Sequence, residues 1–321
     1  MYKNGSKFML FLMLFAIATA FFIMPTLFYA MGMTEEEVSY LIRTPLFLIV
    51  SQLVMLLMPL LLWVYANRGS FTNFLKFEPL EPINVLIIMG IAFLIQPALM
   101  FVSGLTGLFF PNVIGDVVAE FMAYPFWLVL LAIAVTPAIV EELVFRGYIQ
   151  AQYEELGIKK AAIISGLFFG IIHLNMQQFF YAFIAGIIFA YIVYYTKNIV
   201  SGILAHFMLN ASQLLMLRTA LILEEMEIVQ AYEAVPMPEI TPLQVVVAIG
   251  IFALFTTPPA VFLLWMLIKR CKKAHVAVEP AACETELQSP ADHKRPFIDP
   301  FLIAVVVLYV AFIIFTRFDF G

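Results

Sequence analysis

Residues 124–146 have the sequence YPFWLVLLAIAVTPAIVEELVFR, and this stretch decides the class of fold. Its apolar run is long enough to cross the roughly 30 Å hydrocarbon core of a bilayer as an α-helix. The run ends in two adjacent carboxylates, Glu141 and Glu142, followed by a cation, Arg146. Ionisable side chains at membrane depth are energetically costly unless they are paired or hydrated. The stretch therefore predicts a membrane-spanning helix that carries a functional site.

Similar apolar runs recur along the whole chain. Hydrophobic residues make up 64% of the 321 positions and charged residues only 12%, whereas a soluble domain has about 25% charged residues. We therefore predict an all-α fold, a polytopic transmembrane helix bundle of about nine spans. The expected spans lie near residues 8–31, 46–65, 83–103, 124–146, 160–174, 179–196, 199–216, 243–268 and 299–316.

Lys and Arg residues are distributed unequally between the loops. With nine spans, all but three of the 17 Lys and Arg residues fall on one side of the membrane, the exceptions being Arg43, Arg218 and Arg317. Because cytoplasmic loops collect these residues, we expect a cytoplasmic N-terminus and an external C-terminus, in a bacterial-type plasma membrane. The net charge of −5 reflects this unequal distribution and suggests no nucleic-acid partner. The expected partner is the lipid bilayer.

The two carboxylates of the fourth span differ in their local partners. Glu142 and Arg146 are four residues apart, so they share a helix face in the favourable order for an ion pair. Glu141 lies about 100° around the helix and has no such partner, which suits a general base. The alternative interpretation is that both glutamates face the cytoplasmic rim, because Arg146 lies near the end of the span.

The fifth and seventh spans add further polar side chains. His173 follows a Gly-x-x-x-Gly pair that allows close helix contact, and Phe169 is placed to pack over its imidazole. His206 and Asn210 lie four residues apart on one face of the seventh span. Each group alone is compatible with an interhelical hydrogen bond that only stabilises the fold. Together with Glu141 they predict an active site buried between the fourth, fifth and seventh helices.

These polar groups form three ordered motifs: Glu141-Glu142-x-x-x-Arg146, Phe169-x-x-x-His173 and His206-x-x-x-Asn210. This order resembles the signature of the CPBP family, which comprises type II CAAX prenyl proteases and bacteriocin-processing enzymes. The resemblance implies an intramembrane endopeptidase in which Glu141 activates a water molecule with help from His173. It also implies that His206 and Asn210 stabilise the tetrahedral oxyanion. Glu142 and Arg146 would support the site through their ion pair, and Phe169 through its packing.

The resemblance also implies a division of the chain and a class of substrate. Residues 1–103 would form N-terminal transmembrane helices and 104–216 the catalytic helical core. Residues 217–321 would form C-terminal transmembrane helices with a polar cytoplasmic loop at about 269–297. The substrate would be a membrane protein or peptide. The prenyl-protein branch of the family implies cleavage near a lipidated C-terminus, and the bacteriocin branch implies leader removal or self-immunity to a peptide toxin; the motifs do not separate the two. We expect the scissile bond to approach from the cytoplasmic side.

Cofactor use and function each have an alternative. We favour Glu/His catalysis with no metal or other cofactor, because the chain has no His-Glu-x-x-His motif and because His173 and His206 come from different helices. The alternative is zinc bound by Glu141, His173 and His206, with one open position for water. The alternative functions are a catalytically silent membrane scaffold or regulator of the same fold, and a transporter.

Overall fold

The computed structural model describes residues 4–69, 74–110, 113–224, 240–278 and 297–319. In these ranges the regular structure is helical, apart from a single antiparallel β-bridge between Phe77 and Asn198. The bridge fastens the loop before the third long helix to the turn at Lys197, which has a left-handed φ of 47°. The predicted all-α class is confirmed.

Seven helices in the described ranges are long and apolar enough to span a membrane, and each coincides with an expected span. The first three are Gly5–Ala30 (α1 Gly5–Ala18, η1 Thr19–Ile23, α2 Met24–Ala30), Pro45–Ala66 (α4 Pro45–Gln52, η2 Leu53–Leu57, α5 Met58–Ala66) and Pro82–Gly107 (α6 Pro82–Leu94, α7 Gln96–Gly107). The fourth is Phe126–Gln152, which consists of α9 (Phe126–Leu130), η4 (Leu131–Val135), α10 (Thr136–Glu142), η5 (Leu143–Ile149) and η6 (Gln150–Gln152). The last three are Met176–Thr196 (α12), Ile199–Glu224 (α13) and Pro242–Ala274, the greater part of α15 (Pro242–Val278).

The other two expected spans correspond to shorter helices. These are α11 (Ile158–Ile172), with 15 residues, and α17 (Pro300–Asp319), whose apolar stretch Pro300–Thr316 is shorter than 18 residues. The exact number of spans therefore stays a prediction. Three further helices connect the long ones: α3 (Glu35–Ile42), α8 (Val113–Phe121) and η7 (Glu154–Leu156).

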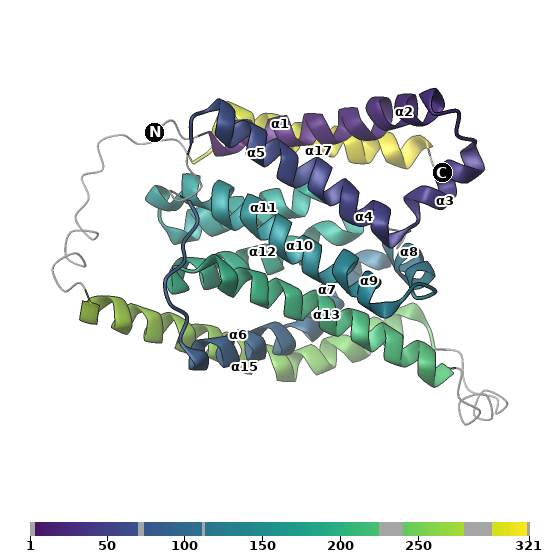
Figure 1. Ribbon diagram of the computed structural model, residues 1–321. Coiled ribbons are helices and arrows are strands. Elements are labelled where there is room, and N and C mark those ends of the chain that lie inside the picture. The colour runs from purple at the N-terminus through teal and green to yellow at the C-terminus, as the bar shows by residue number, and fades with distance from the viewer. Residues whose placement is uncertain (1–3, 70–73, 111–112, 225–239, 279–296, 320–321) are drawn as a thin grey trace.

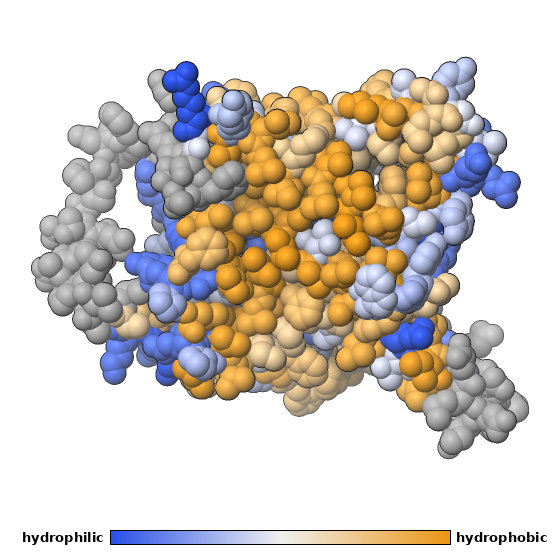
Figure 2. Space-filling model, in the orientation of Figure 1, coloured by the Kyte–Doolittle hydropathy of each residue, from blue (hydrophilic) through white to orange (hydrophobic). Residues whose placement is uncertain are grey.

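The long helices run side by side and enclose α11 and α12 (Figure 1). On one side α1 packs against α17, and on the other α15 packs against α6 and α7. Figure 2 shows a broad hydrophobic band across the molecule, between more hydrophilic margins at its left and right. Such a band is what a bilayer requires of the protein surface that faces lipid. The chain is an integral, multi-pass membrane protein.

Three of the long helices contain a π-helical turn that ends two residues before a proline. These turns are η1 before Pro25, η2 before Pro59 and η4 before Pro137. Proline has no backbone N–H, so the preceding turn cannot close its usual hydrogen bonds and some carbonyl groups need other partners. In the third case the freed carbonyls lie a little more than two turns before Glu141.

α11 and α12 form a close helical hairpin that depends on small residues. A Cβ atom added to Gly166 would lie 2.8 Å from the Phe183 carbonyl oxygen, and one added to Gly170 would lie 2.9 Å from that of Phe179. Real Cβ atoms do not approach carbonyl oxygens so closely. The predicted close contact at the Gly-x-x-x-Gly pair is confirmed, with α12 as the partner helix.

Several predicted helix ends were wrong. The fourth span extends to Gln152 rather than residue 146, and α13 extends to Glu224 rather than residue 216. α15 continues to Val278, so the first ten residues of the predicted 269–297 loop are helical. Lys is a good helix former, and Lys269 packs over the Trp265 ring at 4.0 Å. Residues 279–296 of that loop lie outside the described ranges.

Two apolar clusters flank the candidate site. One includes Val140, Phe145 and Phe169, on the fourth span and α11. The other includes Phe189 on α12 and Leu209 on α13. Arg146 and His206 each contact a ring of both clusters, Phe169 and Phe189.

Candidate active site

Glu142 and Arg146 form an ion pair inside the bundle. Arg146 Nη1 donates to Glu142 Oε1 at 2.7 Å, and both side chains are 0% exposed. Arg146 Nη2 donates to the Gly186 carbonyl on α12 at 3.2 Å. The guanidinium carbon lies 4.3 Å from the Phe169 ring centroid and 5.3 Å from that of Phe189. The predicted ion pair is confirmed, and the alternative that Glu142 faces the cytoplasmic rim is wrong, because the helix continues beyond Arg146.

His206 joins this pair from α13. Its Nδ1 lies 3.1 Å from Glu142 Oε1, and its ring stacks on Phe189 at a centroid distance of 5.3 Å. The Phe169 ring meets it edge-on at 5.7 Å. A carboxylate only accepts hydrogen bonds, so we assign the proton of a neutral His206 ring to Nδ1. Nε2 then remains on the side of Glu141, with its nearest carboxylate oxygen, Glu141 Oε2, at 3.8 Å.

Glu141 differs from its neighbour in the chain. Its side chain is 14% exposed, whereas that of Glu142 is 0% exposed. The 3.8 Å separation from His206 Nε2 is too long for a hydrogen bond. Within the described part of the chain no hydrogen bond holds the Glu141 carboxylate. This carboxylate is therefore positioned beside an imidazole and is free to accept a proton.

His173 lies at the end of α11 and not within it. The helix ends at Ile172, and Leu174 has a φ of 49°, an uncommon conformation for a bulky residue. His173 Nδ1 lies 2.7 Å from the Phe169 carbonyl oxygen, so this nitrogen carries the proton and Nε2 is left as an acceptor. The predicted packing against Phe169 is confirmed, with perpendicular rings 5.1 Å apart. No hydrogen bond or ion pair joins His173 to Glu141 among the described residues.

Asn210 is anchored to the fourth span. Its Nδ2 donates to the Ile133 carbonyl at 3.0 Å. That carbonyl would normally bond to the N–H four residues later, but position 137 is a proline. One N–H of the amide remains for another acceptor, since the group carries two. His206 and Asn210 each have a partner already, Glu142 and Ile133.

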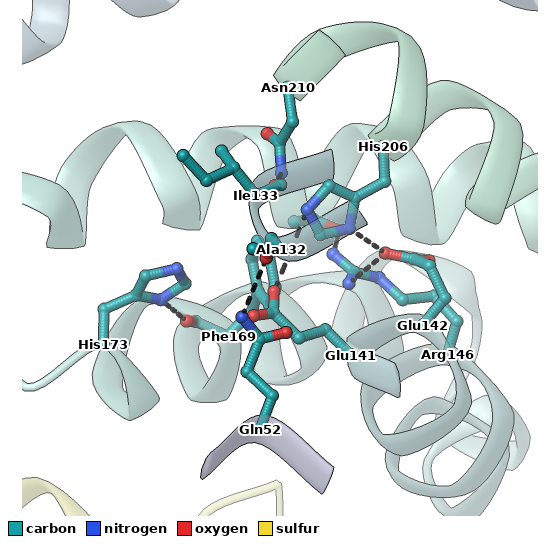
Figure 3. Close-up of polar contacts among 11 residues, drawn as sticks. Gln52, Ala132, Ile133, Glu141, Glu142, Arg146, Phe169, His173, His206 and Asn210 are labelled. Carbon is teal, nitrogen blue, oxygen red and sulfur yellow. Dashed lines mark hydrogen bonds and ion pairs between the residues drawn. The ribbon is translucent and has the colours of Figure 1, made fainter. Parts of the chain in front are cut away.

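Several residues that shape the site were not predicted from the sequence, and Figure 3 shows one of them, Gln52. Gln52, on the second span, donates from Nε2 to the Ala132 carbonyl at 3.2 Å. Gly202 lets Glu142 fit against α13, because a Cβ there would lie 2.6 Å from Glu142 Oε2. Phe189 supplies the stacking face for His206. Pro137 signals that nearby carbonyls need partners, but nothing in the sequence tells which helix supplies them.

The three residues considered for zinc are not arranged as one set of ligands. In the described ranges no group of three or more His, Cys, Asp or Glu side chains is placed to hold a metal ion. Glu141 and His206 lie close to each other, but among the described residues no hydrogen bond or ion pair joins His173 to either of them. The three side chains of the alternative zinc site are therefore not grouped as ligands of one ion.

Comparison with known proteins gives one match. Residues 123–212 match a family described as type II CAAX prenyl endopeptidase, Rce1-like. No curated protein and no solved structure matches the chain. The matched residues lie inside the predicted 104–216 core and contain all three sequence motifs. Over residues 123–212 the chain is therefore similar to the Rce1-like family of type II CAAX prenyl endopeptidases.

Proposed function

We propose that this protein is an intramembrane endopeptidase with Glu141 as its general base. The observation that carries the proposal is the different use of two adjacent carboxylates. Glu142 is buried and bonded to Arg146 and His206, whereas Glu141 is partly exposed and not hydrogen-bonded in the described structure. A general base needs a lone pair that is free to take a proton. The family match supports the same class of reaction.

In the proposed reaction Glu141 removes a proton from a water molecule while the water oxygen bonds to the scissile carbonyl carbon. The carbonyl electron pair moves to its oxygen and gives a tetrahedral oxyanion. When that intermediate collapses, the C–N bond breaks and the proton held by Glu141 passes to the leaving nitrogen. His173 Nε2 is the second acceptor that orients the water. Its contact with the water is formed in the substrate complex, since catalytic hydrogen bonds often tighten only there.

In the proposed active form the His206 ring carries a proton on each nitrogen, so that Nδ1–H bonds to Glu142 and Nε2–H faces the substrate. The proposed oxyanion donors are this Nε2–H and the remaining N–H of Asn210. Asn210 is held through its bond to Ile133, and His206 through its bond to Glu142. Donors fixed in this way do not need to reorganise during the reaction, and one such donor contributes about 3 kcal/mol to transition-state stabilisation. Arg146 balances the charge of Glu142, which keeps the second carboxylate out of the chemistry.

We further propose that the reaction needs no metal ion. The support is that, in the described ranges, no group of three or more His, Cys, Asp or Glu side chains is placed to hold a metal ion. Zinc is the alternative, and a chelator distinguishes the two. For the substrate we propose a prenylated, membrane-associated protein or peptide, in keeping with the family description. We propose that it approaches from the cytoplasmic side, on the basis of the Lys and Arg distribution.

The test uses the full chain in detergent and a quenched-fluorescent farnesylated peptide that ends in a Cys-aliphatic-aliphatic-X sequence. An unlipidated copy of the peptide tests the need for the lipid. Glu141→Gln should lose roughly 100-fold or more in kcat, whereas Glu35→Gln, on the exposed helix α3, should match the wild type. Equal turnover by Glu141→Gln would refute the assignment of the base. Activity lost to a chelator and restored by zinc would refute the metal-free mechanism.

A silent scaffold predicts a different outcome. In that case the wild-type protein would cleave neither peptide, although it binds one of them. Cleavage of the farnesylated peptide alone would support the prenylated substrate class, and equal cleavage of both peptides would contradict it.

A further inference from the structure

Gln52 links the second span to the helix that carries Glu141. It is the last residue of α4, outside the residues that match the family. Its Nε2 donates to the Ala132 carbonyl at 3.2 Å. Its Oε1 is buried and has no hydrogen-bond partner in the described structure. The close-up shows the Gln52 side chain reaching from its helix toward Ala132, beside Glu141 (Figure 3).

The Ala132 carbonyl needs this bond because of Pro137. In the π-helical turn η4 the N–H of Thr136 bonds to the carbonyl five residues earlier, Leu131. The next N–H in that pattern would come from position 137, which is proline and has none. This missing N–H is the one that would reach the Ala132 carbonyl in the five-residue pattern of η4 and the Ile133 carbonyl in the four-residue pattern of an α-helix. A buried carbonyl without a partner is strongly disfavoured.

Two side-chain amides from different helices supply the missing donors. Gln52 on α4 bonds to Ala132, and Asn210 on α13 bonds to Ile133. Both helices pack against η4. The two bonds hold adjacent carbonyls of the same turn, and α10, which carries Glu141, follows this turn directly.

We infer that Gln52 is a positioning residue for this site: with Asn210 it clamps the π-helical turn that sets the placement of Glu141. The kinetic consequence rests on the proposed function. Loss of the Gln52 bond leaves the Ala132 carbonyl free to move, and the adjacent Ile133 carbonyl moves with it. Because Asn210 is held by Ile133, its second N–H then loses its alignment. Gln52 thus acts through Glu141 and Asn210 and does not itself contact the substrate.

The chain contains a matched control residue, Gln150. It is 0% exposed, donates from Nε2 to the Ala190 carbonyl at 3.1 Å, and has a longer bond to Glu154 at 3.3 Å. Its Oε1 is buried without a partner, like that of Gln52. Gln150 lies in η6, two turns beyond Glu141, and its bond holds no part of η4. Gln→Met at either position removes the same kind of donor with little change in volume.

The kinetic experiment compares Gln52→Met and Gln150→Met in the full chain, with the farnesylated peptide as the probe. Gln52→Met should lower kcat roughly tenfold with little change in KM, because it perturbs the reacting groups and not substrate binding. Combined with Asn210→Ala it should lower kcat by less than the product of the two single effects. Gln150→Met should keep the wild-type kcat. A wild-type kcat for Gln52→Met, or fully multiplicative losses, would overturn the inference.

A second measurement tests the clamp without any enzyme assay. Melting temperatures are measured for two double-mutant cycles. The first consists of Gln52→Met, Asn210→Ala and the variant with both changes, and the second has Gln150→Met in place of Gln52→Met. The losses should be non-additive in the first cycle and additive in the second, since only the first pair shares one turn of helix. Additive losses in both cycles would overturn the clamp. If the wild-type protein cleaves no peptide, the proposed function fails while this cycle still decides the clamp.

Discussion

The candidate site has two parts that differ in how their polar groups are held. The buried part consists of Glu142, Arg146 and His206, and the half-buried part of Glu141, His173 and Asn210. Each residue of the buried part contacts another of the same part, and two phenylalanine rings pack on it. Each residue of the half-buried part keeps a donor or acceptor free. From this difference we propose that Glu142 and Arg146 hold the site in place and fix His206 as an oxyanion donor. The half-buried part would then carry the base, its helper and the second oxyanion donor.

The largest expected effect is on the buried part. Arg146→Met leaves the charge of Glu142 without its partner inside the bundle, and breaking a buried pair in this way costs about 3–5 kcal/mol. We expect a large loss of folded protein, measured as the monodisperse fraction after extraction and as the melting temperature. Arg43→Met is the control, because Arg43 and Glu120 form an exposed pair with side chains 53% and 46% exposed, which is worth about 0–1 kcal/mol. Equal losses in the two variants would contradict the comparison.

Gly202 tests how tightly Glu142 is enclosed. Gly202→Ala places a methyl group 2.6 Å from both Glu142 Oε2 and Val193 Cγ2, and overpacking of this kind costs about 1–3 kcal/mol. We expect a lower melting temperature for this variant. Gly107→Ala is the matched control, since an added Cβ there meets no atom within 4 Å. An unchanged melting temperature for Gly202→Ala would show that the carboxylate has room to move.

Phe189 tests the smallest of these contributions. Phe189→Leu removes the ring that stacks on His206, and such aromatic pairs are worth about 0.5–1.5 kcal/mol beyond their buried area. We expect a modest fall in the melting temperature and a lower kcat, because His206 becomes less ordered. Phe262→Leu, at an exposed position on α15, should change neither. A lower melting temperature with an unchanged kcat would show that the ordering of His206 does not matter for the reaction.

The sequence predicted what depends on spacing along one helix. The i, i+4 spacing of Glu142 and Arg146 was sufficient for the ion pair, and the glycine spacing was sufficient for the contact between α11 and α12. Contacts between helices were not predictable in the same way. That His206 pairs with Glu142, and that Gln52 reaches Ala132, depends on how helices far apart in the chain pack. The π-helical turn before Pro137 also changes the phase of its helix, which a uniform 3.6-residue period cannot represent.

The central claim is that two adjacent glutamates have separate tasks, and a side-by-side measurement of Glu141→Gln and Glu142→Gln tests it most directly. Both kcat and the melting temperature are measured for each purified variant. Glu141→Gln should lose roughly 100-fold or more in kcat and keep the wild-type melting temperature. Glu142→Gln should lower the melting temperature sharply, because Arg146 is left buried without a counter-charge. A stable, inactive Glu142→Gln together with an active Glu141→Gln would contradict the account.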